Sequence, residues 1–369
     1  MVSQAAALFG GLPYARYTFL YVDKAYGALE HPDAVTLGAP SADLAGDPDA
    51  LLEETAHEYF HLWNLMRIKP AGYGGVTYEP RPLSTGLWVS EGFTMFYADL
   101  LPRRAGLALR DSTRTRHLER LLARYLENPV FAHYSAERIS QSSYAPDPAF
   151  LGDYQGSTHL DGEILGAMLD LLIRSRTDGR RSLDDVMRGL AQDTTGFTTA
   201  GVQRLVGSAC GCDVGPFFDH YVRGAALIDV NQYLPLIGLR AQIDWVDAVG
   251  DSGRVVPDVR IWAYQPVGAP RPLLLLNTPE SQWGHAGLHS GDSLVTMGDS
   301  AMTDVATFRR IVRRVRVRDT IQVTVRRAGG EFTARVPLTS YRHPVVTIVR
   351  DAAASERVRK LREAWEAGR

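Results

Sequence analysis

The chain has 369 residues, enough for roughly two or three domains of ordinary size. Apolar residues make up 45% of it and charged residues 22%, an ordinary globular balance that supports a full hydrophobic core. The formal net charge of −2 gives no electrostatic reason to propose nucleic acid or a membrane as a partner, and neither is expected. No run approaches the roughly 18 consecutive apolar residues of a transmembrane helix, so no membrane span is expected.

The first two thirds of the chain change from a short strand region to a helical one. Runs of β-type residues such as 17–22 predict short strands between residues 15 and 38. Beyond them, apolar residues recur about every 3.6 positions, the period of an α-helix. This spacing predicts helices over 51–65, 87–101, 112–127, 162–176 and 183–192.

Strand signals return after about residue 235. Short apolar or alternating runs predict strands, and Gly329-Gly330 predicts a hairpin turn between the last two of them. One helix is expected inside this region, over 304–315, and a charged helix over 355–367 closes the chain. The expected strands include 243–246, 259–262, 273–276, 321–325 and 332–336.

The only two cysteines, Cys210 and Cys212, lie too close together for an easy disulfide and are too few for a structural zinc site. We expect two small, buried or half-buried side chains. The first residues carry no basic run ahead of their apolar stretch, so no secretory signal is expected. The compartment stays open, with the cytoplasm slightly favoured.

The strongest chemical signal is the segment 57–61, with the sequence His-Glu-Tyr-Phe-His. Two histidines at this spacing on a helix project from one face, so His57 and His61 are predicted to hold one Zn²⁺ ion per chain. Zinc lowers the pKa of a bound water toward about 7. Glu58, next to the first ligand, could then take the proton of that water as it attacks a peptide carbonyl.

A catalytic zinc site needs a third protein ligand, and Glu91 is the best candidate. It lies at the start of an expected helix between Trp88 and Phe93, where a carboxylate is otherwise hard to explain. The alternative is a helix N-terminal glutamate that the helix dipole stabilises. Metal-bound histidines usually donate their second N–H to a carboxylate or a carbonyl, and Asp99 or a backbone carbonyl could accept it.

Together these residues resemble the glycyl aminopeptidase family of zinc metallopeptidases. The resemblance implies an α+β fold, with a thermolysin-like, mainly helical gluzincin catalytic domain followed by a small β-rich PDZ-like domain. The family also has an N-terminal β domain that this sequence lacks, so we expect that an upstream domain is missing from the chain. The likeness is carried by 57–64 (His-Glu-Tyr-Phe-His-Leu-Trp-Asn), 67–70 (Arg-Ile-Lys-Pro), 87–94 and 213–224.

The resemblance also implies a substrate-binding strand. The segment 26–31 (Tyr-Gly-Ala-Leu-Glu-His) is similar to the family's Gly-Gly-Leu-Glu-His, an edge strand that pairs with the substrate backbone. Gly27 and Ala28 would then bind the substrate main chain. Glu30 would hold the free α-amino group, because a carboxylate selects an ammonium. The alternative for Glu30 is an ordinary surface residue at the end of a strand.

His159 departs from the family pattern. It stands where the family has a tyrosine that stabilises the oxyanion, and Asp161 nearby replaces a lysine. A histidine can donate a hydrogen bond to an oxyanion in the right tautomer or when protonated, so His159 is a candidate catalytic residue. A purely structural histidine is an equal alternative, and Tyr154 could supply the donor instead.

The segment 285–294 resembles the Ala-Gly-Leu-x-x-Gly-Asp turn of bacterial PDZ domains. Such domains bind extended peptide ends by strand addition, so peptide C-termini are expected partners, with 272–276 as the candidate carboxylate-binding rim. A spacer that positions the catalytic domain is the alternative. The expected domains are a catalytic domain at 1–235, a PDZ-like domain at 236–342 and an extension with a charged helix at 343–369.

Three functions follow from these features. The first is an aminopeptidase that releases small N-terminal residues, Gly or Ala, from peptide substrates, with Glu58 activating the zinc-bound water. The second is an endopeptidase on the same site, for which Glu30 would be dispensable. The third is a degenerate peptidase that acts by PDZ peptide binding, which His159 and the missing N-terminal domain suggest.

Overall fold

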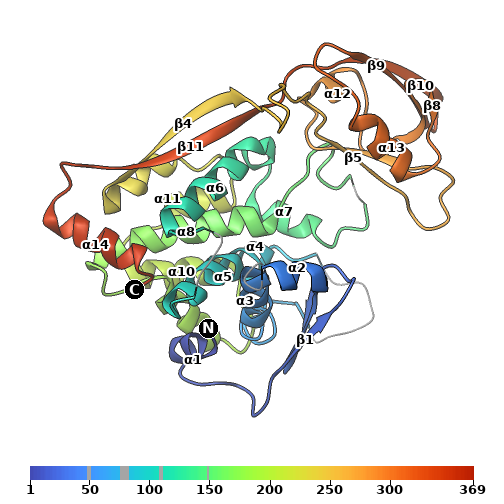
Figure 1. Cartoon of the computed structure of the whole chain (residues 1–369). Helices are drawn as coiled ribbons and strands as arrows, with labels where there is room; N and C mark the ends of the chain where they lie inside the picture. Colours follow the sequence, from blue (N-terminus) through green and yellow to red (C-terminus); the bar gives the residue numbers. More distant parts are fainter. Residues whose placement is uncertain (48–50, 75–82, 108–110, 148) are drawn as a thin grey trace.

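A computed structural model of the chain describes residues 1–47, 51–74, 83–107, 111–147 and 149–369. Figure 1 shows a mainly helical body and, at the upper right, a smaller unit made mostly of strands. A long two-stranded ribbon runs over the body toward the small unit. This mixture of helices and sheets agrees with the expected α+β class. Among the described helices, none is long and apolar enough to cross a membrane.

A helix and a small sheet begin the chain. The helix is α1 (Val2–Phe9), and the strands are β1 (Thr18–Val22), β2 (Ala28–Glu30) and β3 (Ala34–Gly38). The sheet has the order β1-β3-β2, with β1 parallel to β3 and β2 antiparallel to it. The central strand buries Val35 and Leu37, two alternate residues that point to one face. β2 is therefore an edge strand, and it lies beside α3 (Leu52–Phe60).

Helices form the rest of the body around α8 (Thr158–Thr177), most of whose residues are buried. α8 is buried because α5 and α4, among other elements, pack around it. The remaining elements are α2 (Ser41–Gly46), α4 (Leu87–Ser90), α5 (Gly92–Arg104), α6 (Arg114–Glu127), η2 (Pro129–Ala132), α7 (Ala136–Ser142), α9 (Leu183–Ala191), α10 (Thr199–Cys210), α11 (Gly215–Phe217), the π-helix η3 (Phe218–Val222), η4 (Val230–Gln232) and η5 (Leu234–Ile237).

α5 and α8 cross at a pair of glycines. A Cβ atom on Gly92 would lie 2.1 Å from the Cα of Gly162, and one on Gly162 would lie 1.9 Å from the carbonyl oxygen of Trp88. No side chain fits at such distances, so the crossing requires glycine at both positions. It brings the first turn of α8 against the junction of α4 and α5.

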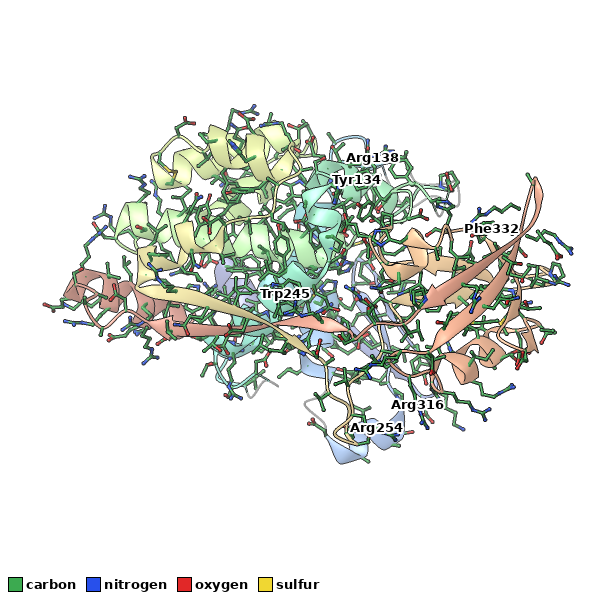
Figure 2. All side chains as sticks on the ribbon, turned by 90° about the horizontal axis from the view of Figure 1, so that it is seen from above. Tyr134, Arg138, Trp245, Arg254, Arg316 and Phe332 are labelled. Atoms are coloured by element: carbon green, nitrogen blue, oxygen red, sulfur yellow. A yellow bond between two sulfur atoms is a disulfide. The ribbon has the colours of Figure 1, made fainter. Side chains whose placement is uncertain are left out.

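The chain leaves the body and returns to it along the ribbon. β4 (Leu239–Asp247) pairs antiparallel with β11 (Arg342–Arg350), and residues of both strands belong to the core of the body. In the view from above, the ribbon runs along the body with Trp245 on it (Figure 2). After β11, α14 (Glu356–Glu366) packs on the body, where Arg114 donates a hydrogen bond of 2.9 Å to the carbonyl of Trp365.

The small unit lies between the two ribbon strands in sequence and has its own hydrophobic core around the buried Trp283. Its sheet has the order β10-β9-β7-β6-β5, and β8 pairs with β7. The predicted hairpin joins β9 to β10, with Ala328 and Gly329 in the turn and Gly330 as the first residue of β10. Its elements are β5 (Ile261–Tyr264), β6 (Leu273–Leu276), α12 (Gln282–His285), β7 (Ser293–Met297), β8 (Ser300–Ala301), α13 (Val305–Val312), β9 (Thr320–Arg327) and β10 (Gly330–Pro337).

The small unit also contacts the loop that leads into α8. In that loop, Asp153 accepts hydrogen bonds from the ring of His289 at 2.7 Å and from the backbone N–H of Ser290 at 2.5 Å. The hydroxyl of Tyr154 donates to Glu280 at 3.0 Å. Tyr154 is therefore engaged with the small unit, which does not favour it as a substitute oxyanion donor.

Several predicted helix limits differ from the structure, and two of the differences lie at the candidate site. α3 ends at Phe60 rather than at residue 65, because the following residues form successive turns and Leu65 has a φ of 142°. α8 begins at Thr158 rather than at residue 162, because the hydroxyl of Ser157 accepts a hydrogen bond from the N–H of Leu160 and caps the helix earlier. His159 therefore lies in the first turn of α8.

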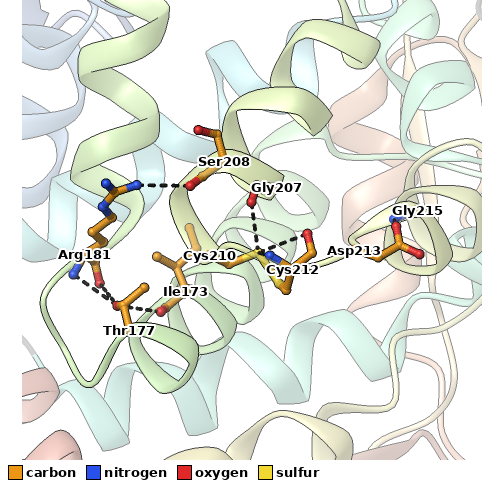
Figure 3. Close-up of a disulfide and its surroundings, with 9 residues drawn as sticks. All are labelled: Ile173, Thr177, Arg181, Gly207, Ser208, Cys210, Cys212, Asp213 and Gly215. Atoms are coloured by element: carbon orange, nitrogen blue, oxygen red, sulfur yellow. Dashed lines mark hydrogen bonds between the residues drawn. A yellow bond between two sulfur atoms is a disulfide. The ribbon is translucent and has the colours of Figure 1, made fainter.

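The expectation that the cysteines stay unpaired is also wrong, because Cys210 and Cys212 form a disulfide (Figure 3). The residue between them, Gly211, has a φ of 62° and ends α10 in the left-handed conformation that glycine favours. The chain folds back there, which leaves the two Cα atoms 5.2 Å apart. This separation is ordinary for a disulfide.

Candidate metal site

α3 presents His57 and His61 on one face. The backbone N–H of His61 donates to the carbonyl of His57 at 3.2 Å, so the two residues are one helical turn apart. Their Nε2 atoms lie 3.0 Å apart, and both side chains are buried. The spacing of the segment thus brings the two imidazoles against each other.

Asn64 joins the turn after α3 to the segment that carries Glu91. Its backbone carbonyl accepts a hydrogen bond of 2.8 Å from Nδ1 of His61, which orients that ring with Nε2 toward the site. Its side-chain amide donates to the carbonyls of Val89 and Ser90 at 2.9 and 3.0 Å. One buried residue therefore orients an imidazole and holds the turn directly before the carboxylate.

Glu91, between α4 and α5, faces both imidazoles. Its Oε2 lies 3.5 Å from Nε2 of His57 and 3.3 Å from Nε2 of His61. The carboxylate comes from a distant part of the sequence, and it meets the histidines because α5 packs on α3. All three predicted ligands thus offer atoms within 3.5 Å of one another.

His159 reaches the same carboxylate from α8. Its Nε2 lies 3.1 Å from Oε2 of Glu91, and its ring is stacked on the ring of His57 with centroids 5.4 Å apart. Its side chain is 49% exposed, whereas that of Glu91 is 14% exposed. The residue expected beside a substrate oxyanion therefore lies among the predicted metal ligands. Asp161, which replaces the family's lysine, is buried, and burial raises its pKa to about 8.

The side chains of the site shift each other's pKa values. Burial lowers the pKa of His57 to about 4, against the opposing hydrogen bond to Glu91. Burial also lowers the pKa of His61, but the charge of Glu91 outweighs it and raises this pKa to about 9. Burial raises the pKa of Glu91, yet the surrounding histidines hold it well below its usual range. Glu91 and His57 are therefore already in the deprotonated forms that bind a metal ion, whereas His61 would have to give up a proton on binding it.

Glu58 is half-buried beside this group. Burial raises the pKa of its carboxyl to about 7, although the charge of His61 opposes the shift. The carboxylates of Glu30 and Glu91 are near enough to raise it as well. A carboxyl with a pKa near 7 can accept a proton at neutral pH.

Glu30 is the last residue of β2, the edge strand beside α3. Ala28 and Glu30 are half-buried, and Leu29 between them is 54% exposed. Gly27 precedes the strand with a φ of 78°, a conformation that favours glycine. The segment therefore offers an edge strand with a carboxylate at its end, near Glu58.

The residues of the site fit a divalent metal ion. Zinc–nitrogen bonds of about 2.0–2.1 Å in a tetrahedral site separate the ligand atoms by about 3.3 Å. The distances of 3.0, 3.3 and 3.5 Å among His57, His61 and Glu91 lie around this value. Two imidazole nitrogens facing each other so closely repel unless a proton or a metal ion lies between them. Imidazole and carboxylate are also the donor types that zinc prefers.

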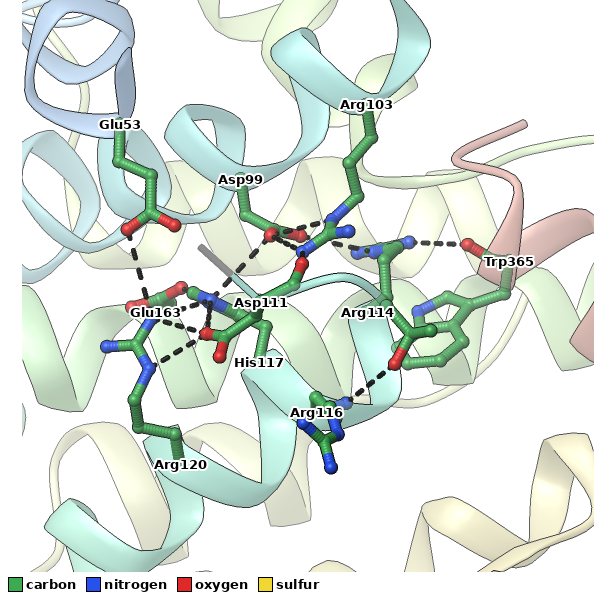
Figure 4. A network of polar contacts seen from close by, with 11 residues as sticks. Glu53, Asp99, Arg103, Asp111, Arg114, Arg116, His117, Arg120, Glu163 and Trp365 are labelled. Atoms are coloured by element: carbon green, nitrogen blue, oxygen red, sulfur yellow. Dashed lines mark hydrogen bonds and ion pairs between the residues drawn. The ribbon is translucent and has the colours of Figure 1, made fainter. Parts of the chain in front are cut away.

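A second, partly buried group of histidine and carboxylates lies between α3, α5, α6 and α8 (Figure 4). Potential ligand atoms of Glu53, Asp111 and His117 lie within 4.8 Å of one another. However, the guanidinium of Arg120 lies 2.7 Å from Asp111 and 3.8 Å from Glu53. We call this group the arginine network, since its carboxylates already have cationic partners.

Asp99 belongs to the arginine network and not to the metal site. Its carboxylate lies 2.7 Å from Arg103 and 3.6 Å from Arg114, and it is buried. It is therefore not the partner of a metal-site histidine. The other predicted acceptor, a backbone carbonyl, is used by His61, while Nδ1 of the buried His57 has no hydrogen-bond partner among the described residues.

Solved structures define the class of fold. An aminopeptidase N family protein from Idiomarina loihiensis is similar over 98% of this chain and 64% of its own, with a TM-score of 0.66 and 21% identity. The chain thus spans 64% of the length of that protein, and the two share a fold. An M1 zinc metallopeptidase from Deinococcus radiodurans, solved as a variant with a Tyr-Ser-Ala substrate, is similar over 62% of this chain and 44% of its own, with a TM-score of 0.43 and 15% identity.

The segment that contains the site matches a family model. Residues 50–158 match the model of the M61 glycyl aminopeptidase family, so the resemblance predicted from the sequence is confirmed. None of the curated proteins matches the sequence.

Sequence reasoning missed the role of Asn64 and the contact of His159 with Glu91. Asn64 lies three residues after His61 in the sequence, and this amide so close to the histidine pair is the signal from which its role could have been predicted. No local pattern indicated the contact of His159, because it depends on how α5 and α8 cross.

Proposed function

We propose that the chain is a zinc-dependent peptidase in which His57, His61 and Glu91 hold one ion. The observation that carries this proposal is the convergence of two imidazole nitrogens and a carboxylate oxygen within 3.5 Å of one another. Bound zinc would polarise the substrate carbonyl and lower the pKa of a water molecule. The protein supplies the rest of the chemistry.

Glu58 is the proposed general base. It follows His57 directly on α3 and is half-buried, so its carboxyl is held close to the ligand set. Because burial raises its pKa to about 7, it can accept a proton from water at neutral pH. The same carboxyl can then give that proton to the leaving amine.

The substitution Glu58→Gln tests the proposal, because it removes the proton acceptor and keeps the size of the side chain. We expect zinc content to stay near one ion per chain while hydrolysis of glycyl and alanyl chromogenic substrates falls by about 100-fold or more. Glu54→Gln, in the first turn of the same helix, is the matched control and should retain both zinc and activity. Zinc-loaded wild-type protein that cleaves no aminoacyl substrate or peptide would contradict the proposal.

We further propose that the enzyme is an aminopeptidase and that Glu30 binds the free α-amino group of the substrate. The support is the position of Glu30 at the end of an edge strand, close enough to Glu58 for their charges to interact. Glu30→Ala should raise the KM for peptides with a free N-terminus and spare N-acetylated ones. If Glu30→Ala changes neither, the endopeptidase alternative takes its place.

We also propose that the small unit is a PDZ-like domain that binds peptide C-termini. β5 forms one edge of its sheet, and a groove with a volume of about 190 Å³ separates β5 from α13. An extended peptide could add to this edge as a further strand. The predicted rim at 272–276 is wrong, because β6 lies inside the sheet between β5 and β7. The groove is lined by Ile261, Trp262, Ala263, Phe308, Arg309, Val312 and Arg313.

Fluorescence anisotropy with labelled peptides tests this role. Peptides with a free C-terminus should bind the wild type more tightly than their amidated forms, and Val312→Glu should weaken that binding by placing a charge in the groove. Arg326→Gln, on β9 away from the groove, serves as the control. Peptide binding by a zinc-loaded protein without any turnover would favour the degenerate peptidase.

A further inference from the structure

His159 occupies a position that zinc binding by His57, His61 and Glu91 does not require. Its Nε2 lies 3.1 Å from the same oxygen of Glu91 that faces the two histidines of α3. Ligand atoms of His57, Glu91 and His159 all lie within 4.8 Å of one another. The imidazole thus has the position of a ligand and not only of a neighbour.

The helix crossing accounts for this position. Glu91 directly precedes Gly92, and His159 lies about one helical turn before Gly162. Because neither glycine leaves room for a Cβ atom, α5 and α8 touch backbone to backbone. The first turn of α8 is therefore held against the junction that carries Glu91, and the side chain of His159 needs no unusual reach.

The chemistry of the side chain distinguishes ligation from a role on the substrate. A residue that stabilises an oxyanion must direct an N–H toward the substrate. Nε2 of His159 instead faces the carboxylate ligand, and its ring stacks on that of His57. A neutral imidazole offers a lone pair to zinc directly, whereas the tyrosine of the family pattern would first have to lose a proton of pKa about 10.

We infer that His159 is a fourth, displaceable protein ligand of the metal ion. This inference rests on the proposed zinc site. The resting site would hold the ion with three imidazoles and one carboxylate, so His159 occupies the position that the substrate needs. Its side chain is 49% exposed, whereas His57 and His61 are 9% and 3% exposed, so His159 is the ligand that can swing out.

Metal affinity tests this inference without reference to activity. Zinc Kd is measured by competition with a chelating dye, and the visible spectrum of the Co²⁺-loaded protein reports the ligands around the ion. His159→Ala and His159→Tyr should raise the zinc Kd by on the order of ten- to a hundredfold and should change the Co²⁺ spectrum. His220→Ala is the matched control, because His220 is exposed and contacts the carbonyl of Pro216.

The zinc Kd and the turnover per bound zinc together separate the two roles of His159. A displaceable ligand predicts that His159→Ala raises the zinc Kd and changes the Co²⁺ spectrum, whether or not kcat also changes. An oxyanion donor predicts an unchanged Kd and a kcat that falls by about 100-fold in His159→Ala.

The remaining outcomes distinguish this inference from the zinc site itself. An unchanged Kd and Co²⁺ spectrum in both His159 variants, with metal lost in His57→Ala, overturns the inference and leaves the proposed function in place. A wild-type protein that binds neither zinc nor Co²⁺ overturns both.

Discussion

The candidate metal site and the arginine network are two groups of histidine and carboxylate side chains between the helices of the body, and they differ in what balances their charge. In the candidate metal site, three imidazoles surround the single carboxylate of Glu91, and no arginine or lysine in the described part of the chain pairs with it. In the arginine network, the single imidazole of His117 pairs with Glu163, and guanidinium groups pair with Asp99 and Asp111. Asp99 and Asp111 of the network have guanidinium partners, whereas the partners of Glu91 in the candidate metal site are imidazoles, which can also bind a metal ion.

The difference shows how a metal site can be told from an ion-pair network. Both clusters contain groups of potential ligands within 4.8 Å of one another, so proximity alone does not separate them. Arg120 and Arg103 do distinguish the two clusters, because their guanidinium groups pair with carboxylates that a metal ion would otherwise bind. The predictions below test that distinction.

His57→Ala should have the largest effect on zinc binding and activity, since it removes a ligand from the candidate metal site. We expect zinc content to fall from about one ion per chain to near zero, and hydrolysis to be lost. Ligand binding stabilises the folded state by mass action, so added zinc should raise the Tm of the wild type and leave that of His57→Ala unchanged. Equal zinc-induced shifts in both proteins would show that the ion binds elsewhere.

His117→Ala, in the arginine network, should lower the stability of the fold and leave zinc binding unchanged. The ring of His117 lies 2.6 Å from the carboxylate of the buried Glu163, and its removal leaves that charge without its partner. We expect the free energy of unfolding to fall by about 3–5 kcal/mol, measured by urea denaturation, with zinc content unchanged. A loss of zinc in a folded His117→Ala protein would mean that the network is itself a metal site.

The arginine network should also make stability depend on pH. Burial and Arg120 lower the pKa of His117, but Glu163 and Asp99 outweigh them and raise it to about 9. The pKa of His117 in the folded state thus exceeds the unfolded value of about 6.5. Protonated His117 therefore stabilises the fold fully below about pH 6.5, and this stabilisation is lost as the pH rises through 9. Urea denaturation at pH 6 and pH 9.5 should differ by about 3 kcal/mol in the wild type, and by clearly less in His117→Ala.

Asn64→Ala should have a smaller effect that touches both stability and metal binding. It removes the amide that donates to Val89 and Ser90, and two buried carbonyls lose a partner. We expect a loss of about 2 kcal/mol in the free energy of unfolding and a zinc Kd about tenfold higher, because Glu91 is held less firmly. Ser142→Ala, whose hydroxyl donates only to the carbonyl of Ile139 within α7, is the control and should leave the zinc Kd unchanged.

The sequence predicted the features that depend on residues close together in the chain. The helical spacing of His57 and His61 places their rings together, and the apolar spacing predicted α6, α9 and most of α5 within a few residues. The third predicted ligand, Glu91, depended on the resemblance and on a carboxylate between aromatic residues, and the structure does bring it to the histidine pair.

The features that the sequence did not predict depend on packing or on one unusual residue. The contact of His159 with Glu91 requires the glycine pair that lets α5 and α8 touch. The disulfide requires the left-handed turn at Gly211, which no residue count could reveal. The pairing of β4 with β11 joins strands separated by the whole small unit, and no local pattern encodes such a partner.

The pairing of β4 with β11 means that the small unit could be excised from within the chain. Asp247 and Arg342 stand opposite each other at the end of the ribbon, so both connections to the small unit leave from neighbouring points. Cutting the chain at 236 would also discard β11 and α14, which help to close the core of the body. A tight hairpin turn grafted between Asp247 and Arg342 would instead excise the unit and leave the body with its own C-terminal cover.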